Sequence, residues 1–151
     1  EIELICIGGR GNYLKNFKKY VEKSLHPDRI LVIPHISKLE VLDYVENSDV
    51  LVLPNSAKDK MNLYTSPIKL FEYMASKRPI VASNISAIKE ILHHNENAFL
   101  FESDNPKDLA LKIKNAINYD CKKMVDNAYI QATKYTWNNR AETIASFINE
   151  L

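Results

Sequence analysis

A lysine and a glutamate three residues apart, Lys69 and Glu72, are the side chains of this sequence whose spacing best suits chemistry. They follow Ser66 and Pro67, a pair typical of a helix start, because serine caps free N–H groups and proline lacks one that would go unpaired. A helix start carries positive partial charge and attracts phosphate. Lys69 and Glu72 share one face of this helix. They can hold a nucleotide's phosphates and hydroxyls, or they can form an ordinary surface ion pair. From the residues alone, the surface ion pair is the favoured interpretation.

The three glycines of the chain all lie in the run Gly8-Gly9-Arg10-Gly11. Backbone N–H groups of such a turn can approach a phosphate, and Arg10 can reach a ligand from it. Gly9 and Gly11 match a dinucleotide-binding fingerprint, but Leu14 stands where its third glycine belongs. We therefore favour a tight turn that needs positive φ, with the phosphate turn as the alternative.

Two further segments follow predicted strands. In Pro34–Lys38, backbone groups around Ile36 can grip the edge of a base and His35 can cover its face, although a histidine there is more often structural. The polar stretch Asn55–Tyr64 is long for a connection in a compact domain. It is either a functional loop or a disordered surface loop.

The length, charge and cysteine content of the chain limit the classes of function that it can have. The chain has 151 residues, enough for one domain, and its 20 basic and 19 acidic residues give no support to a nucleic-acid partner. Cys6 and Cys121 are isolated and lack metal-ligand spacing, which predicts a reducing compartment, the cytoplasm, and no metal. We find no signal peptide and no apolar run of membrane-spanning length. The chain opens in an apolar run without a preceding methionine, so we expect a fragment whose upstream part is missing.

Short apolar runs alternate with helical patterns along the whole chain, which predicts βαβ units and a Rossmann-like α/β fold with a parallel sheet between helices. Ligands of such sheets bind beyond the C-terminal ends of the strands. The predicted strands are Ile2–Ile7, Ile30–Ile33, Val50–Leu53, Pro79–Ala82 and Ala98–Phe101. The predicted helices are Tyr13–Leu25, Lys38–Asn47, Pro67–Lys77, Ser86–His93, Pro106–Asn118 and a region from Lys122 to Leu151 that breaks near Tyr135–Asn138.

The segment Thr65–Ser83, TSPIKLFEYMASKRPIVAS, resembles the signature of retaining glycosyltransferases of the GT-B fold, in their C-terminal, nucleotide-sugar-binding domain. Other segments agree in order and spacing, so the resemblance covers nearly the whole chain; they are Arg29–Leu53, Ala87–Phe101, Pro106–Ile117 and Tyr135–Ile144. The resemblance implies that residues 1–151 form the donor-binding, C-terminal half of a GT-B enzyme, with the acceptor domain absent from this chain.

The resemblance also implies roles for residues. The glutamate that matches Glu72 binds the donor ribose, and many members carry another glutamate eight residues earlier, against the donor sugar, where this chain has Tyr64. The family's basic Arg and Lys pair belongs upstream of Ile2–Ile7. The positions implied to surround the diphosphate and sugar are Ser66, Pro67, Ile68, Lys69 and Tyr64; those implied to hold the base are His35, Ile36 and Lys38, with Gly9 and Arg10 left as a phosphate turn.

By this resemblance the chain is part of a hexosyltransferase that moves a sugar from a nucleoside diphosphate sugar to an acceptor glycan or lipid-linked glycan. We expect a role in bacterial surface polysaccharide synthesis in the cytoplasm, with membrane contact only peripheral, no metal cofactor, and no activity of the chain alone. Three alternatives stay open: a non-catalytic nucleotide-sugar-binding subunit, for which Tyr64 is the best argument; a GT-B nucleotide-sugar epimerase; and a plain dinucleotide-binding domain, against which Leu14 counts.

Overall fold

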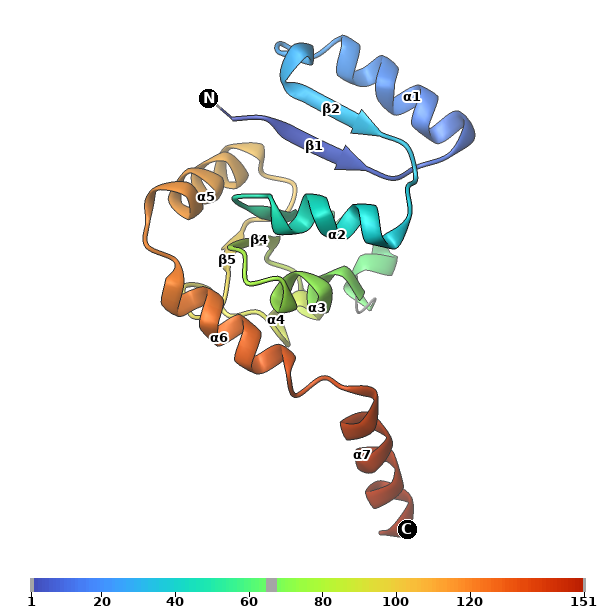
Figure 1. Ribbon diagram of the computed structural model, residues 1–151, viewed down its shortest axis with the longest axis vertical. Helices are drawn as coiled ribbons and strands as arrows, with labels where there is room; N and C mark the ends of the chain where they lie inside the picture. The colour runs from blue at the N-terminus through green and yellow to red at the C-terminus, as the bar shows by residue number, and fades with distance from the viewer. Residues whose placement is uncertain (1, 65–67, 151) are drawn as a thin grey trace. The chain divides into compact units, whose positions relative to one another are not determined.

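The computed structural model describes residues 2–64 and 68–150. The chain divides into two compact units, one up to Tyr44 and one from Val45 onward. Each unit contains its own set of parallel strands flanked by helices (Figure 1). The mixed α/β fold with parallel sheets, which strand–helix alternation predicts, is therefore confirmed.

The first unit is built on two parallel strands. β1 pairs with β2 in a register that places Leu4 opposite Ile30 and Ile7 opposite Ile33. The N–H of Gly8 donates to the carbonyl of Ile33 at 3.0 Å and continues the pairing past the strand ends. The elements of this part are β1 (Leu4–Ile7), α1 (Gly11–Glu22), the 3-10 helix η1 (Pro27–Arg29), β2 (Ile30–Ile33) and α2 (Lys38–Glu46), whose last residues belong to the second unit.

The turn between β1 and α1 needs its glycines for conformational reasons. Gly8, Gly9 and Gly11 have φ values of 128°, 79° and 56°, which L side chains rarely adopt. A Cβ on Gly9 would meet the Leu14 Cβ at 3.6 Å, an ordinary contact, so backbone conformation and not space demands glycine there. This is the tight turn that the glycine spacing favours.

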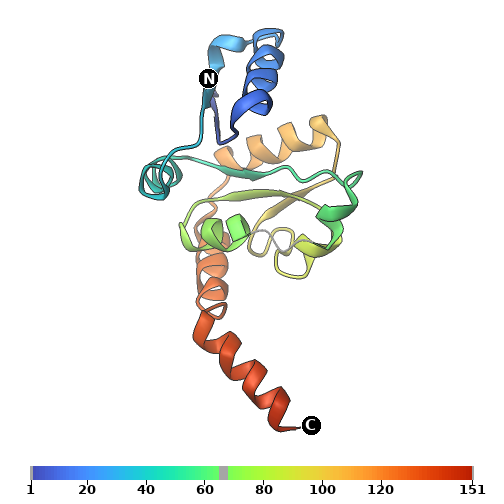
Figure 2. The same ribbon diagram turned by 90° about the vertical axis from the view of Figure 1, so that its right-hand side faces the viewer.

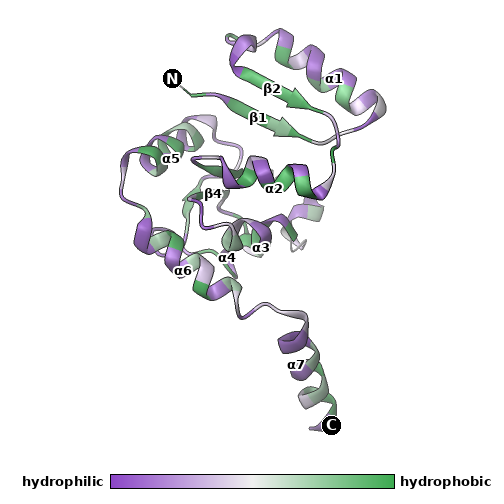
Figure 3. Ribbon diagram, in the orientation of Figure 1, coloured by the Kyte–Doolittle hydropathy of each residue, from purple (hydrophilic) through white to green (hydrophobic). Residues whose placement is uncertain are grey.

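The strands of the first unit are more exposed than parallel strands usually are. Leu4, Ile5 and Leu31 are 46%, 40% and 52% exposed, although their sequence predicts cover on both faces. Figure 3 shows both strands as hydrophobic and α1 as mostly hydrophilic. A two-stranded sheet offers few neighbours against which such side chains can be buried.

The second unit holds a three-stranded parallel sheet in the order β3-β4-β5. Leu51 lies opposite Ile80, and Val81 lies opposite Phe99. The elements are β3 (Leu51–Leu53), the 3-10 helix η2 (Lys60–Leu63), α3 (Ile68–Ala75), β4 (Ile80–Ser83), α4 (Ser86–Lys89), β5 (Phe99–Phe101), α5 (Pro106–Asn118), α6 (Lys122–Ala132) and α7 (Trp137–Asn149).

Alternation along the strands divides the core of the second unit into two layers. Ile80 and Ala82 pack with side chains of α3, α4 and α6, whereas Val81 lies on the other face with Phe99 and Ala116 of α5. Figure 2 shows α5 along one face of this sheet and α3 and α4 along the opposite face. Leu70 and Met74 of α3 are buried in the first layer, which fixes the side of α3 that faces the sheet.

One predicted helix is shorter than its sequence pattern. The segment Ser86–His93 is helical only to Lys89, the last residue of α4. The carbonyl of Ile91 accepts side-chain amide hydrogens from Asn97 and Gln131, at 3.0 and 3.1 Å. The Asn97 amide oxygen also accepts a hydrogen bond from the N–H of His93 at 2.7 Å. These side chains satisfy backbone groups that a longer helix would have paired.

The C-terminal region has the predicted break. Thr136 caps α7 by accepting the N–H of Asn139 at 3.1 Å, and the ring of Tyr135 packs on Phe71 of α3 with 5.0 Å between centroids. None of the residues of α7 is buried. Within the described ranges, no helix has both the length and the apolar character needed to cross a membrane.

Candidate functional site

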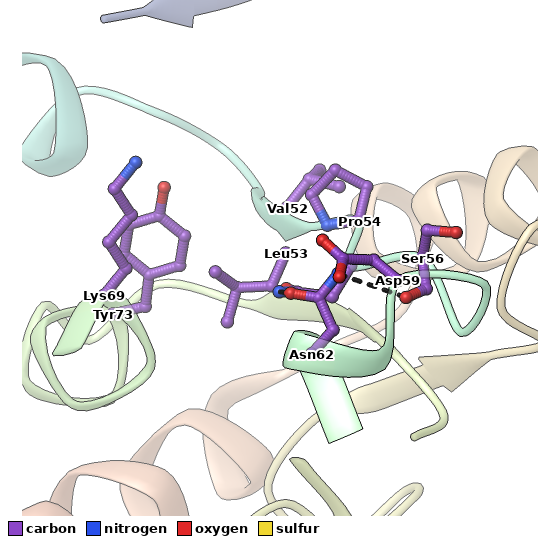
Figure 4. Close-up of a pocket in the computed structure, with 9 residues that line it drawn as sticks. Val52, Leu53, Pro54, Ser56, Asp59, Asn62, Lys69 and Tyr73 are labelled. Atoms are coloured by element: carbon purple, nitrogen blue, oxygen red, sulfur yellow. Dashed lines mark hydrogen bonds between the residues drawn. The ribbon is translucent and has the colours of Figure 1, made fainter. Parts of the chain in front are cut away.

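A pocket of 470 Å³ lies at the C-terminal end of β3 in the second unit. Its floor is the end of the strand, and its two walls are the segment after β3 and one face of α3 (Figure 4). This is the end of a parallel strand where ligands of α/β sheets bind. The lining residues are Val52, Leu53, Pro54, Asn55, Ser56, Asp59, Asn62, Lys69 and Tyr73.

Amide side chains organise the first wall. The Asn55 amide nitrogen donates to the Asn62 side-chain oxygen at 3.1 Å, and the Asn62 amide nitrogen donates to the Ser56 carbonyl, also at 3.1 Å. Asp59 accepts the Met61 N–H at 3.0 Å and so caps η2. These hydrogen bonds hold the segment after β3 together as one wall of the pocket, in keeping with the functional-loop alternative.

The second wall is one face of α3. Lys69 and Tyr73 are four residues apart, so they project from the same side of the helix, and Figure 4 shows the ammonium and hydroxyl groups pointing the same way. Burial raises the pKa of Tyr73, and the Glu72 carboxylate raises it further. The phenol therefore stays protonated at neutral pH and can donate a hydrogen bond beside a cation, a pairing that suits an anionic, hydroxyl-bearing ligand.

The residues predicted around the diphosphate and ribose are only partly gathered at this pocket. Lys69 lines it, while Glu72 follows three residues later on α3 and is partly buried. Ile68 begins the described part of α3 and is 75% exposed. The predicted helix start at Ser66 and Pro67 falls outside the residues that the structure describes.

Tyr64 stands apart from the pocket lining. It follows η2, its N–H donates to the Met61 carbonyl at 3.2 Å, and its side chain is 86% exposed. The carboxylate among the pocket-lining residues is Asp59, five positions earlier.

The predicted base-binding residues lie in the first unit, between β2 and α2. His35 is exposed, Ile36 is partly buried, and Lys38 is the first residue of α2. Ser37 and Glu40 form a reciprocal capping box, in which the Ser37 N–H donates to the carboxylate at 2.9 Å and the Glu40 N–H donates to the hydroxyl at 3.3 Å. The Ser37 hydrogen bonds lower the pKa of Glu40. The box fixes the backbone from Ser37 to Glu40, directly after Ile36 and around Lys38.

The predicted phosphate turn also belongs to the first unit. Gly9 lies in the turn after β1, and Arg10 is the exposed residue just before α1. The candidate site residues are thus divided between two units, each folded around its own strands.

Sequence reasoning named only Lys69 individually among the pocket-lining residues, and the polar ones that it missed include Asn55, Asn62 and Tyr73. The first two fall inside the stretch that sequence length and polarity mark as a candidate functional loop, which was the available signal. Tyr73 has a helical signal, since it lies one turn after Lys69. In the described part of the chain, no group of three or more His, Cys, Asp or Glu residues is arranged to hold a metal ion.

Comparison with known families gives a match over most of the chain. Residues 1–134 match the family model of glycosyl transferases group 1. Among curated proteins, the chain is 30% identical over 113 residues to an uncharacterized glycosyltransferase of Haemophilus influenzae, a match that covers 74% of this chain and 30% of that protein. It is 25% identical over 145 residues to an uncharacterized glycosyltransferase of Methanocaldococcus jannaschii, a match that covers 95% of this chain and 39% of that protein. It is 30% identical over 71 residues to the amylovoran biosynthesis glycosyltransferase AmsK of Erwinia amylovora, a match that covers 47% of this chain and 17% of that protein.

Solved structures show the same fold. HepE of Anabaena in complex with UDP superposes with a TM-score of 0.83 at 16% identity over 99% of this chain and 41% of its own. The C-terminal domain of the group 1 glycosyl transferase LpcC of Francisella tularensis superposes with a TM-score of 0.73 at 23% identity, over 88% of this chain and 69% of that domain. HepE has also been solved with UDP-glucose. The chain therefore spans about two fifths or less of the full-length proteins that it resembles here.

Proposed function

The chain belongs to the family of group 1 glycosyl transferases, and on that premise we propose that it is the donor-binding part of a glycosyltransferase. The enzyme would transfer a sugar from a nucleoside diphosphate sugar to an acceptor. The observation that carries the proposal is the pocket at the end of β3, because one of its walls is α3, the helix formed by the signature segment. A pocket of this size lies in the range of small-molecule sites.

In this proposal, α3 handles the charged half of the donor. Lys69 lies beside the diphosphate, and Glu72 accepts hydrogen bonds from the ribose hydroxyls. The resemblance assigns the phosphates to Ser66, Pro67 and Ile68, through backbone N–H groups of this segment, although Pro67 itself has none. Charge that develops on the leaving diphosphate would be stabilised by these N–H groups and by the Lys69 ammonium.

For residues of the first unit, the proposal follows the family resemblance. We assign the base to His35, Ile36 and Lys38, of which Lys38 lies inside the Ser37–Glu40 capping box. Gly9 and Arg10 are secondary candidates for a phosphate contact, since the turn alone accounts for the glycines.

The setting of the enzyme is proposed from its relatives. AmsK is an amylovoran biosynthesis glycosyltransferase, which supports a role in surface polysaccharide synthesis, with a glycan or lipid-linked glycan as the acceptor. Matches to 30% and 39% of two relatives support a longer parent in which another domain binds the acceptor. We propose that the chain alone is inactive, and that the parent works in the cytoplasm with peripheral membrane contact.

A non-catalytic nucleotide-sugar-binding subunit is the second candidate. The observation that favours it is Tyr64, whose side chain is 86% exposed and which stands where the family resemblance implies a sugar-binding glutamate in many members. Such a protein would bind the donor and transfer nothing.

Calorimetry on the longer parent tests the proposal. We expect UDP, ADP or GDP, together with the matching nucleotide sugar, to bind, and Glu72→Ala to lower the affinity about tenfold or more, because hydrogen bonds to a charged group contribute about 1.5–3 kcal/mol. Glu90→Ala, at the end of α4 and outside the pocket lining, is the matched control. Unchanged affinity in Glu72→Ala contradicts the ribose assignment. Sugar transfer by the unaltered protein excludes the non-catalytic subunit.

A further inference from the structure

The turn between β5 and α5 is hydrogen-bonded to the wall of the pocket. The Ser56 hydroxyl donates to Asp104 Oδ1 at 2.7 Å. The N–H of Ala57 donates to the Ser103 hydroxyl at 2.8 Å and lies 3.2 Å from Asp104 Oδ2, and the Ser103 hydroxyl donates to the Asn55 carbonyl at 2.9 Å. These bonds join segments more than 45 residues apart, and we call them the Ser103–Asp104 clamp.

The clamp is built into the turn by an unusual backbone conformation. Asp104 has a φ of 62°, in the left-handed region that non-glycine residues rarely adopt, although aspartate tolerates it better than most. Hydrogen bonds from Ser56 and Ala57, with the nearby Lys58 ammonium, lower the pKa of Asp104. The carboxylate is therefore charged at neutral pH and accepts both bonds.

The clamped segment is the first wall of the pocket. Asn55 and Ser56 line the pocket and are held directly, while Asn62 is tied to both through its amide group. Ser103 and Asp104 do not line it. The clamp therefore acts on any pocket ligand only through the wall.

We propose that Ser103 and Asp104 are positioning residues for donor binding, which hold Asn55–Asn62 as a preformed wall of the pocket. The inference rests on the proposed function for its ligand and goes beyond it by giving a role to a turn outside the pocket. A connection of this length would otherwise have to be ordered when the ligand binds, and ordering at binding lowers affinity. Loss of the clamp thus weakens donor binding without removing a ligand contact.

Three variants separate the clamp from backbone effects. Asp104→Gly removes both carboxylate bonds and keeps the left-handed conformation without strain. Asp104→Asn keeps one acceptor and should behave between Asp104→Gly and the unaltered protein. Ser103→Ala removes the other half of the clamp. The matched control is Asp120→Asn, since Asp120 is an exposed aspartate that accepts a local N–H, from Lys122 at 3.0 Å.

Hydrogen exchange measured by mass spectrometry tests, without any ligand, whether the clamp protects the backbone amides of the wall. In the longer parent protein, we expect faster exchange at the amide of Ala57 and its neighbours in Asp104→Gly and Ser103→Ala, and unchanged exchange in β4 and in the control. Equal exchange in all variants overturns the inference, because the wall then holds its conformation without the clamp.

Donor affinity gives the second readout, with UDP and UDP-glucose as the probes in calorimetry. We expect Asp104→Gly to bind UDP-glucose about three- to tenfold more weakly, with partial recovery in Asp104→Asn. Faster exchange with unchanged affinity overturns the claim that the clamp serves the pocket. If the unaltered protein binds no nucleoside diphosphate or its sugar, the proposed function fails, and the donor role of the clamp fails with it, while the exchange result still shows whether the wall depends on Ser103 and Asp104.

Discussion

Lys69 and Tyr73 lie one turn apart on α3, and both side chains line the pocket at the end of β3 (Figure 4). The helix buries Leu70 and Met74 against the sheet, which leaves the Lys69–Tyr73 face toward the pocket. A cation next to a neutral hydroxyl donor can bind an anion, which a nucleoside lacks and a nucleoside diphosphate carries. The first two predictions concern this face.

Replacing Lys69 by methionine tests the charged contact. We expect Lys69→Met to lower the affinity for a nucleoside diphosphate by about 1.5–3 kcal/mol, roughly 10- to 150-fold, because it removes a hydrogen-bond donor to a charged group. The affinity for the matching nucleoside should not change. Lys114→Met, at an exposed position of α5, serves as the control. A parallel loss of nucleoside binding would show that α3 itself has been disturbed.

Tyr73 should act as a neutral donor over a wide pH range. Its pKa is raised by burial and then by the Glu72 charge, so the hydroxyl keeps its proton well past neutral pH. We expect Tyr73→Phe to weaken donor binding about two- to tenfold, the value of one net hydrogen bond, by the same factor at pH 7 and pH 9. Calorimetry at both pH values measures it. A loss that disappears at pH 9 would mean that the phenol has already ionised there, and so that its pKa is lowered and not raised.

Local signals predicted the elements well, and long-range contacts explain most of the differences. The helix Pro106–Asn118 has the bounds that its sequence predicts, because Asn105 and Pro106 specify its start without help from the rest of the fold. The helix predicted to end at His93 ends at Lys89, because the side chains of Asn97 and Gln131 form hydrogen bonds with backbone groups after Lys89. The sequence of the helix itself does not predict these contacts.

The pocket, too, could be predicted only in part from the sequence. The helical period places Lys69 and Tyr73 on one face, so the α3 wall follows from local sequence. The opposite wall depends on the Asn55–Asn62 amide pair and on Asp104, which is 48 residues from Ser56 in the chain. No periodic pattern encodes such a pairing, so the sequence could mark that stretch only as long and polar.

The cap of α5 gives a stability prediction. The Asn105 side chain accepts the N–H groups of Lys107 and Asp108, each at 3.1 Å. We expect Asn105→Ala to lower the free energy of unfolding by about 0.5–2 kcal/mol, and Asn105→Asp to leave it nearly unchanged, since aspartate caps equally well. Denaturant unfolding followed by circular dichroism measures both. A loss of equal size in the aspartate variant would point to the Asn105–Glu102 side-chain bond instead of the cap.

Removal of divalent cations tests the proposal that donor binding needs no metal. In that proposal the diphosphate charge is met by helix N–H groups and Lys69, so we expect the affinity for UDP-glucose to stay within about twofold when the chelator EDTA replaces Mg²⁺, a difference of roughly 0.4 kcal/mol. The measurement is calorimetry on the same protein in both buffers. A tenfold loss in EDTA would show that a cation joins the donor.

His94 should make folding stability depend on pH. Its Nδ1 accepts the Leu100 N–H at 2.9 Å, which places the proton of the neutral ring on Nε2, 3.4 Å from the Lys112 ammonium. Partial burial lowers the pKa of His94, Lys112 lowers it further, and Asp108 opposes the shift.

The folded protein therefore resists protonation of His94, while the unfolded chain takes up the proton near the ordinary pKa of 6.5. We expect the free energy of unfolding to fall as the pH drops below 6.5 and to level off below the lowered pKa of the folded state. His94→Asn, whose side-chain oxygen can still accept the Leu100 N–H, should flatten this part of the curve. Lys112→Met should raise the pKa of His94, as followed by NMR titration. Equal pH slopes in His94→Asn and the unaltered protein would show that other groups carry the acid sensitivity.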